Sequence, residues 1–324
     1  MDGQMAGPQP DQPGKSGSPK SGSPKSGPPR PERRIDADDD FARLHERGKL
    51  HRIERGPESE PYDIHTDVIR APALPGEVAA LPTVDRAIDV VAADLLVQAL
   101  NCIRTFGDFH LALSGGRSPV PLYERLMYDP NYRSLPWQKT HLWIVDEPRV
   151  PFTDPRSSFR LIRETIVDHS DIPPQQVHPI FPIGDAPDEA YEAVLREVLA
   201  WREKGQDRLD FVLLGVGEDG STAGLAPHTR LLNSRRGDAR QLVGVARAPE
   251  VAEPGRVTMT PALINASRFV AVLAFGAEKR AAVARIAGGH EPTEALPLKA
   301  IRPTGGTLKW YLDAAAAGAT APEA

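Results

Sequence analysis

The feature of this sequence that most constrains its fold is a regular alternation of short apolar runs with helical patterns from Val84 onward. Apolar residues recur at helical spacing from Ile88 to Ile103, and Gly107 ends that pattern. The next apolar run, 109–113, has the length of a strand that is covered on both faces. Alternation of this kind predicts an α/β sandwich built around a mostly parallel sheet.

The same alternation continues as far as residue 286. Further strands are expected at 141–145, 177–181, 209–214, 242–246 and 268–274. Helices are expected from Pro119 onward and at 157–167, 187–201 and 278–286. The order of these elements gives no reason to expect a second folded domain.

The first 60 residues differ from the rest in composition. Prolines are crowded there, and between Lys15 and Pro29 the pattern Lys-Ser-Gly-Ser-Pro recurs three times, with the last copy ending Gly27-Pro28-Pro29. Such a repeat has no apolar face whose burial could offset its ordering entropy. We therefore expect four parts, which are a disordered tail over 1–60, an extended lead-in over 61–83, one α/β domain over 84–318 and a short C-terminal tail over 319–324.

Composition narrows the class of protein. The 324 residues carry a net charge of −5, which does not favour binding to nucleic acid or to a membrane surface. The single cysteine, Cys102, excludes an intrachain disulfide framework and a multi-cysteine metal site. No apolar run has the length of a membrane span, and the polar start lacks a signal core. A soluble, cytoplasmic protein without a metal is expected.

The loop at 114–119 is the first of four segments with residues suited to chemistry. Ligands of open α/β sheets bind at the carboxyl ends of strands, and this loop joins an expected strand to an expected helix. Its two glycines would let backbone N–H groups point at an anion near the helix start. The candidate phosphate-binding residues are Ser114, Gly115, Gly116, Arg117 and Ser118. A tight turn that happens to use two glycines is the alternative interpretation.

The other three segments also follow expected strands. The carboxylates of the 146–149 segment can form an acid/base site or a solvated turn. Residues 215–220 read G-x-G-x-x-G, but Pro227 interrupts the helix that a dinucleotide fingerprint requires, so no nicotinamide or flavin site is expected. Arg256 and Lys279 are either ordinary surface cations or, with the 114–119 loop, a clamp for a phosphate dianion.

Taken in order, these segments resemble the glucosamine-6-phosphate isomerase/6-phosphogluconolactonase family. The similarity runs from about Ala79 to Ala316. The matching segments are Ser114–Pro119 (phosphate loop), Val145–Pro151 (Asp-Glu-Arg-x-Val-Pro), Ser157–Phe159 (Ser-Asn-Tyr), Leu214–Pro227 (Leu-Gly-x-Gly-x-Asp-Gly-His-Thr-Ala-Ser-Leu-Phe-Pro) and Arg256–Thr260 (Arg-x-Thr). The resemblance implies a Rossmann-like three-layer α/β/α sandwich with a mostly parallel sheet.

The resemblance also implies a function. That function is hydrolysis of 6-phospho-D-glucono-1,5-lactone to 6-phosphogluconate in the oxidative pentose phosphate pathway, with no cofactor. The expected partner is this small phosphorylated sugar lactone. Arg149, Arg256 and Lys279 are expected to join the phosphate loop in binding it.

The departures from the family pattern fall where the chemistry is expected. Ser221 occupies the position of the family's histidine, which is thought to act as general base, and Pro148 replaces an arginine that reappears as Arg149. A serine hydroxyl is not basic at neutral pH, so it would orient a water or require a neighbouring base. The candidate catalytic residues are Asp146, Asp219, Ser221 and His228, with Glu147 as a further carboxylate.

Two alternatives remain open at this point. A sugar-phosphate binding protein that lost its base but kept its anion clamp fits the same residues. An aldose–ketose isomerase or deaminase is less well matched, because those relatives continue toward Phe-Asn-Glu-Pro, whereas Thr222–Leu225 follows the lactonase form.

Overall fold

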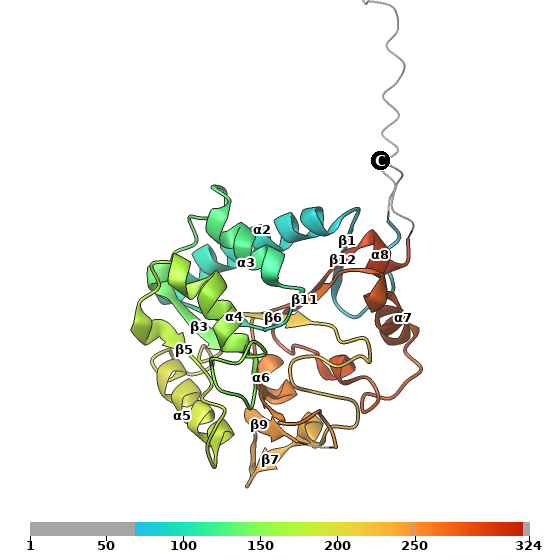
Figure 1. Ribbon diagram of the computed structural model, residues 1–324. Helices are drawn as coiled ribbons and strands as arrows, with labels where there is room; N and C mark the ends of the chain where they lie inside the picture. The colour runs from blue at the N-terminus through green and yellow to red at the C-terminus, as the bar shows by residue number, and fades with distance from the viewer. Residues whose placement is uncertain (1–68, 248, 320–324) are drawn as a thin grey trace, which may run out of the picture. The chain divides into compact units, whose positions relative to one another are not determined.

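The structure, a computed structural model, describes residues 69–247 and 249–319 (Figure 1). The tail expected over 1–60 lies outside these residues, as does nearly all of the segment 319–324.

A seven-stranded sheet forms the middle layer. Its strands run in the order β1-β12-β11-β6-β2-β3-β5, and all neighbouring pairs are parallel. Strands β2 and β11 are buried along their whole length, which explains their uninterrupted apolar sequences. The expected α/β class with a mostly parallel sheet is confirmed. The strands are β1 (Glu77–Leu81), β2 (Phe109–Leu113), β3 (Thr140–Ile144), β5 (Val177–His178), β6 (Phe211–Gly215), β11 (Phe269–Ala274) and β12 (Thr307–Asp313).

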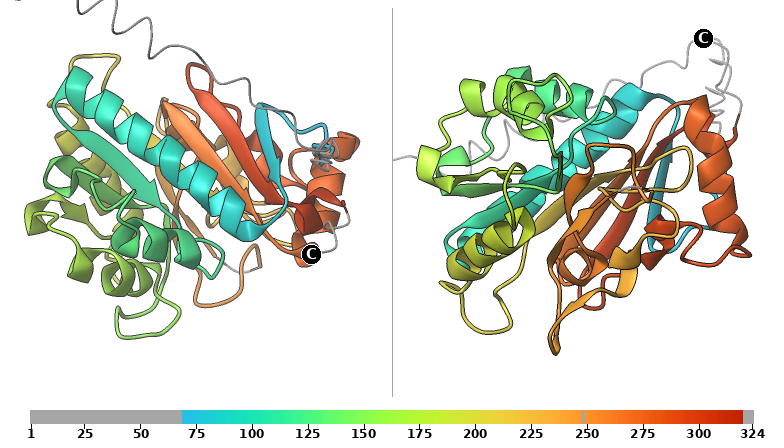
Figure 2. Two further views of the ribbon diagram at one scale, coloured as in Figure 1. Left: turned by 90° about the horizontal axis from the view of Figure 1, so that it is seen from above. Right: turned by 60° about the horizontal axis from the view of Figure 1, so that its bottom comes forward.

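Helices cover both faces of this sheet. In Figure 1, α2 and α3 lie on one side of the sheet, and α5 and α6 lie on the other. The left view of Figure 2 shows α2 lying across the strands. Among the described residues, no helix combines the length and the apolar character needed to cross a membrane. The helices are α2 (Val84–Phe106), α3 (Val120–Tyr128), α4 (Ser158–Thr165), α5 (Pro187–Leu199), α6 (Pro261–Ile264), α7 (Arg280–Gly288) and α8 (Ala314–Ala317).

A smaller antiparallel sheet stands beside the main one. It consists of β4 (Asp146–Pro148), β10 (Arg256–Met259) and β9 (Val243–Ala246), in the order β4-β10-β9. The chain leaves the main sheet after β3 and enters β4 at once, so Asp146 lies opposite Thr258. The strand expected at 242–246 therefore belongs to this small sheet.

The edge strand β1 and its neighbour β12 differ from the sequence-based expectation. Strand β1 lies inside the segment 61–83 that was expected to be a lead-in, and β12 had not been expected as a strand. The two pair with each other, with Glu77 opposite Lys309, and the Trp310 indole donates to the Pro75 carbonyl at 2.8 Å. This pairing joins segments that are far apart in the chain, so local periodicity does not reveal it.

A buried ionic network ties the amino ends of the central strands together. The Asp210 carboxylate is fully buried and accepts hydrogen bonds from Arg202 at 2.6 and 2.8 Å and from Arg268 at 2.9 Å. It also accepts the backbone N–H of His110 at 2.7 Å. Arg202 reaches Asp108 as well, at 2.6 Å. Removing one member of a buried ionic network leaves the other charges without a partner and so lowers the free energy of unfolding.

We expect Asp210→Ala to lower the free energy of unfolding by about 3–5 kcal/mol, because two arginines would lose their buried counter-ion. Urea denaturation followed by circular dichroism measures this change. Arg156→Ala, which removes an exposed cation paired with Asp154, is the control and should leave the unfolding midpoint in place. Equal effects of the two substitutions would contradict a structural role for the network.

Three histidines from adjacent strands form a stacked row on the α5 side of the sheet. They are His110 on β2, His141 on β3 and His178 on β5, and the His141 Nδ1 and His178 Nε2 atoms are 3.0 Å apart. The Trp143 ring stacks on His178, with centroids 3.9 Å apart. Burial lowers the pKa of His141 to about 4 and that of His178 to about 3. The folded protein therefore holds this pair uncharged.

These lowered pKa values predict a loss of stability in acid. The two histidines take up protons near pH 6.5 in the unfolded chain but only near pH 4 (His141) and pH 3 (His178) in the folded chain. Their stabilisation is therefore present above pH 6.5 and declines as the pH falls. We expect the unfolding free energy to drop by about 1–2 kcal/mol between pH 7 and pH 5 through His178. In His178→Gln the decline should be shallower, whereas the control His169→Gln, at an exposed position, should retain the full decline.

Candidate active site

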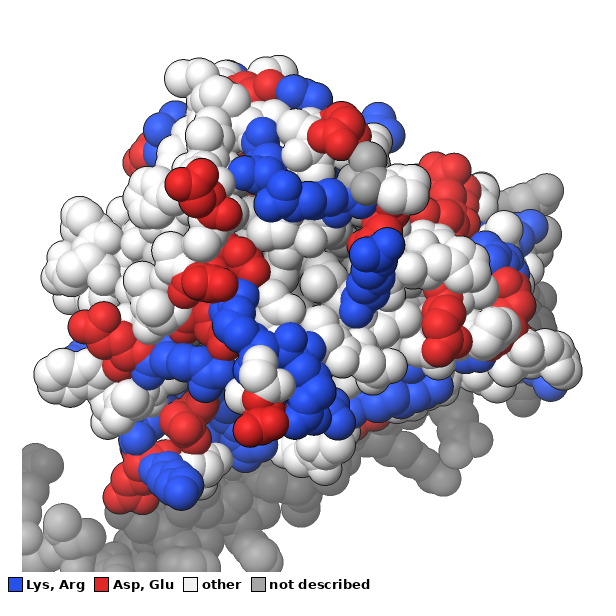
Figure 3. Space-filling model, turned by 90° about the horizontal axis from the view of Figure 1, so that it is seen from below, with Lys and Arg blue, Asp and Glu red and all other residues white. Residues whose placement is uncertain are grey.

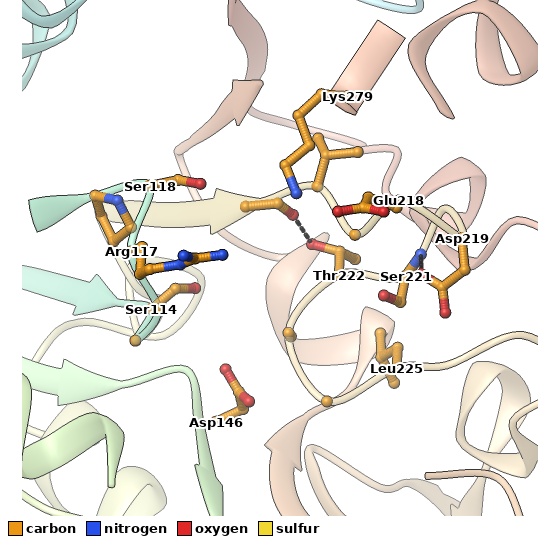
Figure 4. Close-up of a pocket in the computed structure, with 18 of the residues that line it drawn as sticks. Ser114, Arg117, Ser118, Asp146, Glu218, Asp219, Ser221, Thr222, Leu225 and Lys279 are labelled. Atoms are coloured by element: carbon orange, nitrogen blue, oxygen red, sulfur yellow. Dashed lines mark hydrogen bonds between the residues drawn. The ribbon is translucent and has the colours of Figure 1, made fainter. Parts of the chain in front are cut away.

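A cleft opens at the topological switch point of the main sheet, between β2 and β6. From β2 the chain adds β3 and β5 on one side, and it then returns to add β6, β11 and β12 on the other. The loops that leave β2 and β6 therefore diverge, and such a switch point is where open α/β sheets bind ligands. The cleft encloses about 960 Å³ between the loops that follow β2, β6 and β11 (Figure 4).

Most of the residues singled out in the sequence line this cleft. Because the strands that carry them are neighbours in the sheet, their loops converge at one edge. The expected site residues found there are Ser114, Gly115, Gly116, Arg117, Ser118, Asp146, Asp219, Ser221, Arg256 and Lys279.

The 114–119 loop is fixed from below by contacts to its neighbours. The Ser114 hydroxyl donates to the Leu213 carbonyl of β6 at 2.7 Å, and the Tyr123 hydroxyl donates to the Ser114 carbonyl at 2.5 Å. At Gly115 a Cβ atom would lie only 2.4 Å from Ser158 Oγ, so a side chain there would push the loop away from α4. Ser114 thus has a structural hydrogen bond, and its hydroxyl hydrogen is not free for a ligand.

Two cations project into the cleft from separate elements. Arg117 comes from the loop after β2, and Lys279 comes from the turn after β11. Figure 4 shows both side chains and Ser118 directed toward the middle of the cavity. Cations and hydroxyls placed around one space suit a phosphate group, whose oxygens accept several charge-assisted hydrogen bonds.

The third cation, Arg256, is already paired. Its Nε atom donates to Asp146 Oδ2 at 2.6 Å, and its Nη2 atom contacts the same oxygen. The antiparallel pairing of β4 with β10 sets up this contact, and Asp146 is only 3% exposed. The two side chains form a nearly neutral unit on the cleft wall, so Arg256 has less charge to offer a ligand than Lys279 or Arg117.

The neighbouring carboxylate, Glu147, points into the protein. It is fully buried and accepts the backbone N–H groups of Ser158 at 2.9 Å and Phe159 at 2.7 Å at the start of α4. Burial raises the pKa of Glu147 to about 7, assisted by the nearby Asp146 charge and opposed by these hydrogen bonds. Glu147 therefore holds α4 against the 114–119 loop and has no access to a ligand in the cleft.

The loop 215–226 forms successive turns. Gly217 N–H donates to the Ser221 carbonyl at 2.8 Å, and the Thr222 hydroxyl donates to the Gly215 carbonyl at 2.8 Å. The Ser221 N–H donates to Asp219 Oδ1 at 2.9 Å. Within this described loop, no helix follows the G-x-G-x-x-G string. A dinucleotide fingerprint requires a helix at that point, and the position of Pro227 predicted its absence.

Two expected site residues lie outside the cleft lining, which corrects the sequence-based placement. The Arg149 guanidinium donates to the carbonyls of Pro182 at 3.1 Å and Gly184 at 3.0 Å, which directs it to the loop after β5. His228 is exposed, has a left-handed backbone (φ 62°) and donates its N–H to the Glu294 carbonyl at 2.6 Å. These contacts hold both residues away from the other candidates.

Sequence motifs missed one wall of the cleft. Residues 250–252 reach it from the connection between β9 and β10, and Glu250 accepts the Thr229 hydroxyl there at 3.0 Å. No motif marks this segment, because its place depends on the small sheet. The charged residues that line the cleft are Arg117, Asp146, Glu218, Asp219, Glu250, Arg256, Glu278 and Lys279.

The surface gives no support to a nucleic-acid interface on the face that Figure 3 displays. Lys and Arg side chains gather near its lower centre, but Asp and Glu side chains lie among and around them. An electrostatic footprint for nucleic acid would be a continuous basic patch or stripe.

Comparisons with known proteins agree with this geometry. The family model for glucosamine-6-phosphate isomerases/6-phosphogluconolactonase matches residues 82–310. The human GDH/6PGL endoplasmic bifunctional protein is 35% identical over 80% of this chain, which spans about a third of that protein's length (32%). A 6-phosphogluconolactonase from Synechocystis sp. is 35% identical over 68% of this chain and 91% of its own length.

Solved structures show the same fold. The crystal structure of 6-phosphogluconolactonase from Thermotoga maritima is 25% identical, with a TM-score of 0.60 over 73% of this chain and 99% of that one. The crystal structure of the devB protein is 29% identical, with a TM-score of 0.64 over 75% of this chain and 98% of that one. The order of the motifs, the cleft at the switch point and these matches together place the chain in the glucosamine-6-phosphate isomerase/6-phosphogluconolactonase family.

Proposed function

We propose that the protein hydrolyses 6-phospho-D-glucono-1,5-lactone to 6-phosphogluconate, the lactone-opening reaction of the oxidative pentose phosphate pathway. The observation that carries the proposal is the convergence of Arg117 and Lys279 on a cleft whose opposite wall holds Ser221 and Asp219. The relatives named as 6-phosphogluconolactonases, which this chain covers almost completely, support the same reaction.

The phosphate end of the substrate is assigned to the cations. Arg117, Lys279 and the backbone N–H groups of the 114–119 loop surround a space suited to a dianion. The Asp146–Arg256 pair forms a neighbouring polar wall with little net charge. Binding the phosphate here would leave the lactone ring toward the 215–226 loop.

The chemical step is the attack of water on the ring ester. The water oxygen bonds to the carbonyl carbon, the ring C–O bond breaks, and the ring oxygen leaves as a hydroxyl after taking up a proton. A lactone is an activated ester, so one general base and hydrogen bonds to the developing oxyanion supply much of the required acceleration. The reaction written this way uses only water and protein groups.

The partner is a small phosphorylated lactone, and neither nucleic acid nor a membrane takes part. The chain's single cysteine suits a reducing compartment, so we assign the activity to the cytoplasm.

Purified full-length protein is expected to open the phosphorylated lactone well above the spontaneous rate. The readout is acid release in a weakly buffered solution, with the uncatalysed reaction run in parallel. Glucono-1,5-lactone without phosphate is the control substrate and should be opened far more slowly, because it offers nothing to Arg117 and Lys279. Binding of 6-phosphogluconate without any acceleration would contradict the proposal and indicate a binding protein.

Lys279→Gln should raise KM for the phosphorylated lactone by about 10- to 100-fold, with a smaller effect on kcat. The reason is that a charge-assisted hydrogen bond to phosphate is worth about 1.5–3 kcal/mol. Arg280→Gln removes the adjacent exposed cation, which does not line the cleft, and should leave both constants within about twofold. A similar KM for the two variants would place the phosphate elsewhere.

A further inference from the structure

We propose that the Asp219 carboxylate is the general base of this protein and that the Ser221 hydroxyl orients the attacking water. The inference rests on the proposed lactone hydrolysis and assigns the step that the missing family histidine leaves open. It replaces an imidazole by a carboxylate two positions earlier on the same loop.

The two side chains meet at one point of the cleft. A Cβ atom at Gly217 would lie 2.0 Å from Ser221 Oγ and 2.6 Å from Asp219 Oδ1, so the two oxygens are no farther apart than the sum of these distances. Figure 4 shows Ser221 and Asp219 side by side on the loop, with Ser221 on the cavity side. A water between these oxygens could hydrogen-bond to both, and only a glycine at position 217 leaves room for it.

The other candidate bases are occupied or misplaced. Asp146 is bound by Arg256, Glu147 is buried against the start of α4, and His228 lies outside the cleft lining. Glu250 accepts the Thr229 hydroxyl, and Glu278 lies on the turn after β11. Glu218 is therefore the competitor on the same loop as Asp219. In Figure 4 the Glu218 carboxylate lies on the Lys279 side of the loop, away from Ser221.

Among the described residues, no cation is paired with the Asp219 carboxylate. Arg285 reaches the Asp219 carbonyl at 3.4 Å, but its guanidinium is paired with Glu291 at 2.7 Å. Asp219 is exposed, and only Oδ1 takes part in the turn with the Ser221 N–H. The second carboxylate oxygen takes no part in that turn.

The proton balance of the step is closed. Asp219 takes one proton from the water as its oxygen bonds to the lactone carbonyl carbon, which gives a tetrahedral oxyanion. When the oxyanion collapses, the ring C–O bond breaks and the protonated Asp219 returns that proton to the leaving ring oxygen. The carboxylate is restored, and the product acid loses its own proton to solvent.

The decisive test compares Asp219→Asn with Glu218→Gln in the full chain. Asparagine keeps the Oδ1 acceptor that the Ser221 N–H needs, so the turn is retained while the base is removed. We expect Asp219→Asn to lower kcat by about 10²- to 10⁴-fold, the usual contribution of a general base, with KM within about threefold. Glu218→Gln removes the same charge one residue away and should keep kcat within about threefold.

Several results would overturn the inference. A kcat for Asp219→Asn within threefold of the native value, or equal losses in both variants, shows that Asp219 is not the base while leaving the lactonase function intact. A native protein with no acceleration overturns the proposed function and this inference together. Matching thermal melting and 6-phosphogluconate binding of Asp219→Asn and native protein exclude misfolding as the cause of a loss.

A second test does not depend on the Asp219 variant. The ordinary pKa values of an aspartate and an imidazole differ by about 2.5 pH units, so Ser221→His should move the acidic limb of the kcat profile upward by about that amount. The kcat profile is used because it follows groups of the substrate complex, whereas kcat/KM would also follow the second ionisation of the free substrate's phosphate. Ser221→Ala should lower kcat by about tenfold or less and leave the limb in place. An acidic limb of the native protein that already lies near pH 6.5 would indicate a histidine base and overturn the proposal.

Discussion

The hydrogen bond from Ser114 Oγ to the Leu213 carbonyl joins the two strands between which the cleft opens. It connects the end of β2 to β6 at the point where the sheet changes its direction of growth. The loops above it diverge because their strands continue into elements on opposite sides, while this bond keeps their bases together. The bond therefore fixes the floor of the cleft, while the loops above it leave the cleft open. The positions of both candidate substrate-contacting loops depend on the same pair of strands, β2 and β6.

A second set of contacts fixes the position of the cleft wall. The chain crosses from β3 into β4 and so carries Asp146 to the small sheet, where Arg256 meets it. Glu147, the next residue, faces the opposite way and binds the start of α4, which in turn packs against Gly115. Consecutive carboxylates thus have different tasks because alternate residues of a strand face opposite sides. One serves the cleft wall, and the other fixes the helix behind the phosphate loop.

The parts of the fold that depend on local sequence could be predicted. The α2 helix ends at Gly107 because that residue adopts a left-handed backbone (φ 94°), and β2 coincides with the apolar run 109–113. The pairing of β1 with β12 and the place of residues 250–252 depend on contacts between distant segments, so no periodicity reported them. The same limit applies to the site. Motif order brought together the glycine-rich loops and Lys279, whereas Arg149 and His228 were misplaced because backbone carbonyls outside the motifs hold them.

Ser221 stands where the resemblance to the family leads us to expect a histidine, and the same loop offers a carboxylate nearby. Asp219 is needed there for shape, since its Oδ1 atom holds the Ser221 N–H and so closes the turn that follows Gly217. The same residue places a carboxylate next to position 221. Serine at 221 is small enough to leave space for a water between this carboxylate and a lactone, and an activated ester requires less of its base than an amide would. The residue that closes the turn and the residue proposed to take the proton are then the same, Asp219, so the order of the loop also fixes the position of the proposed base.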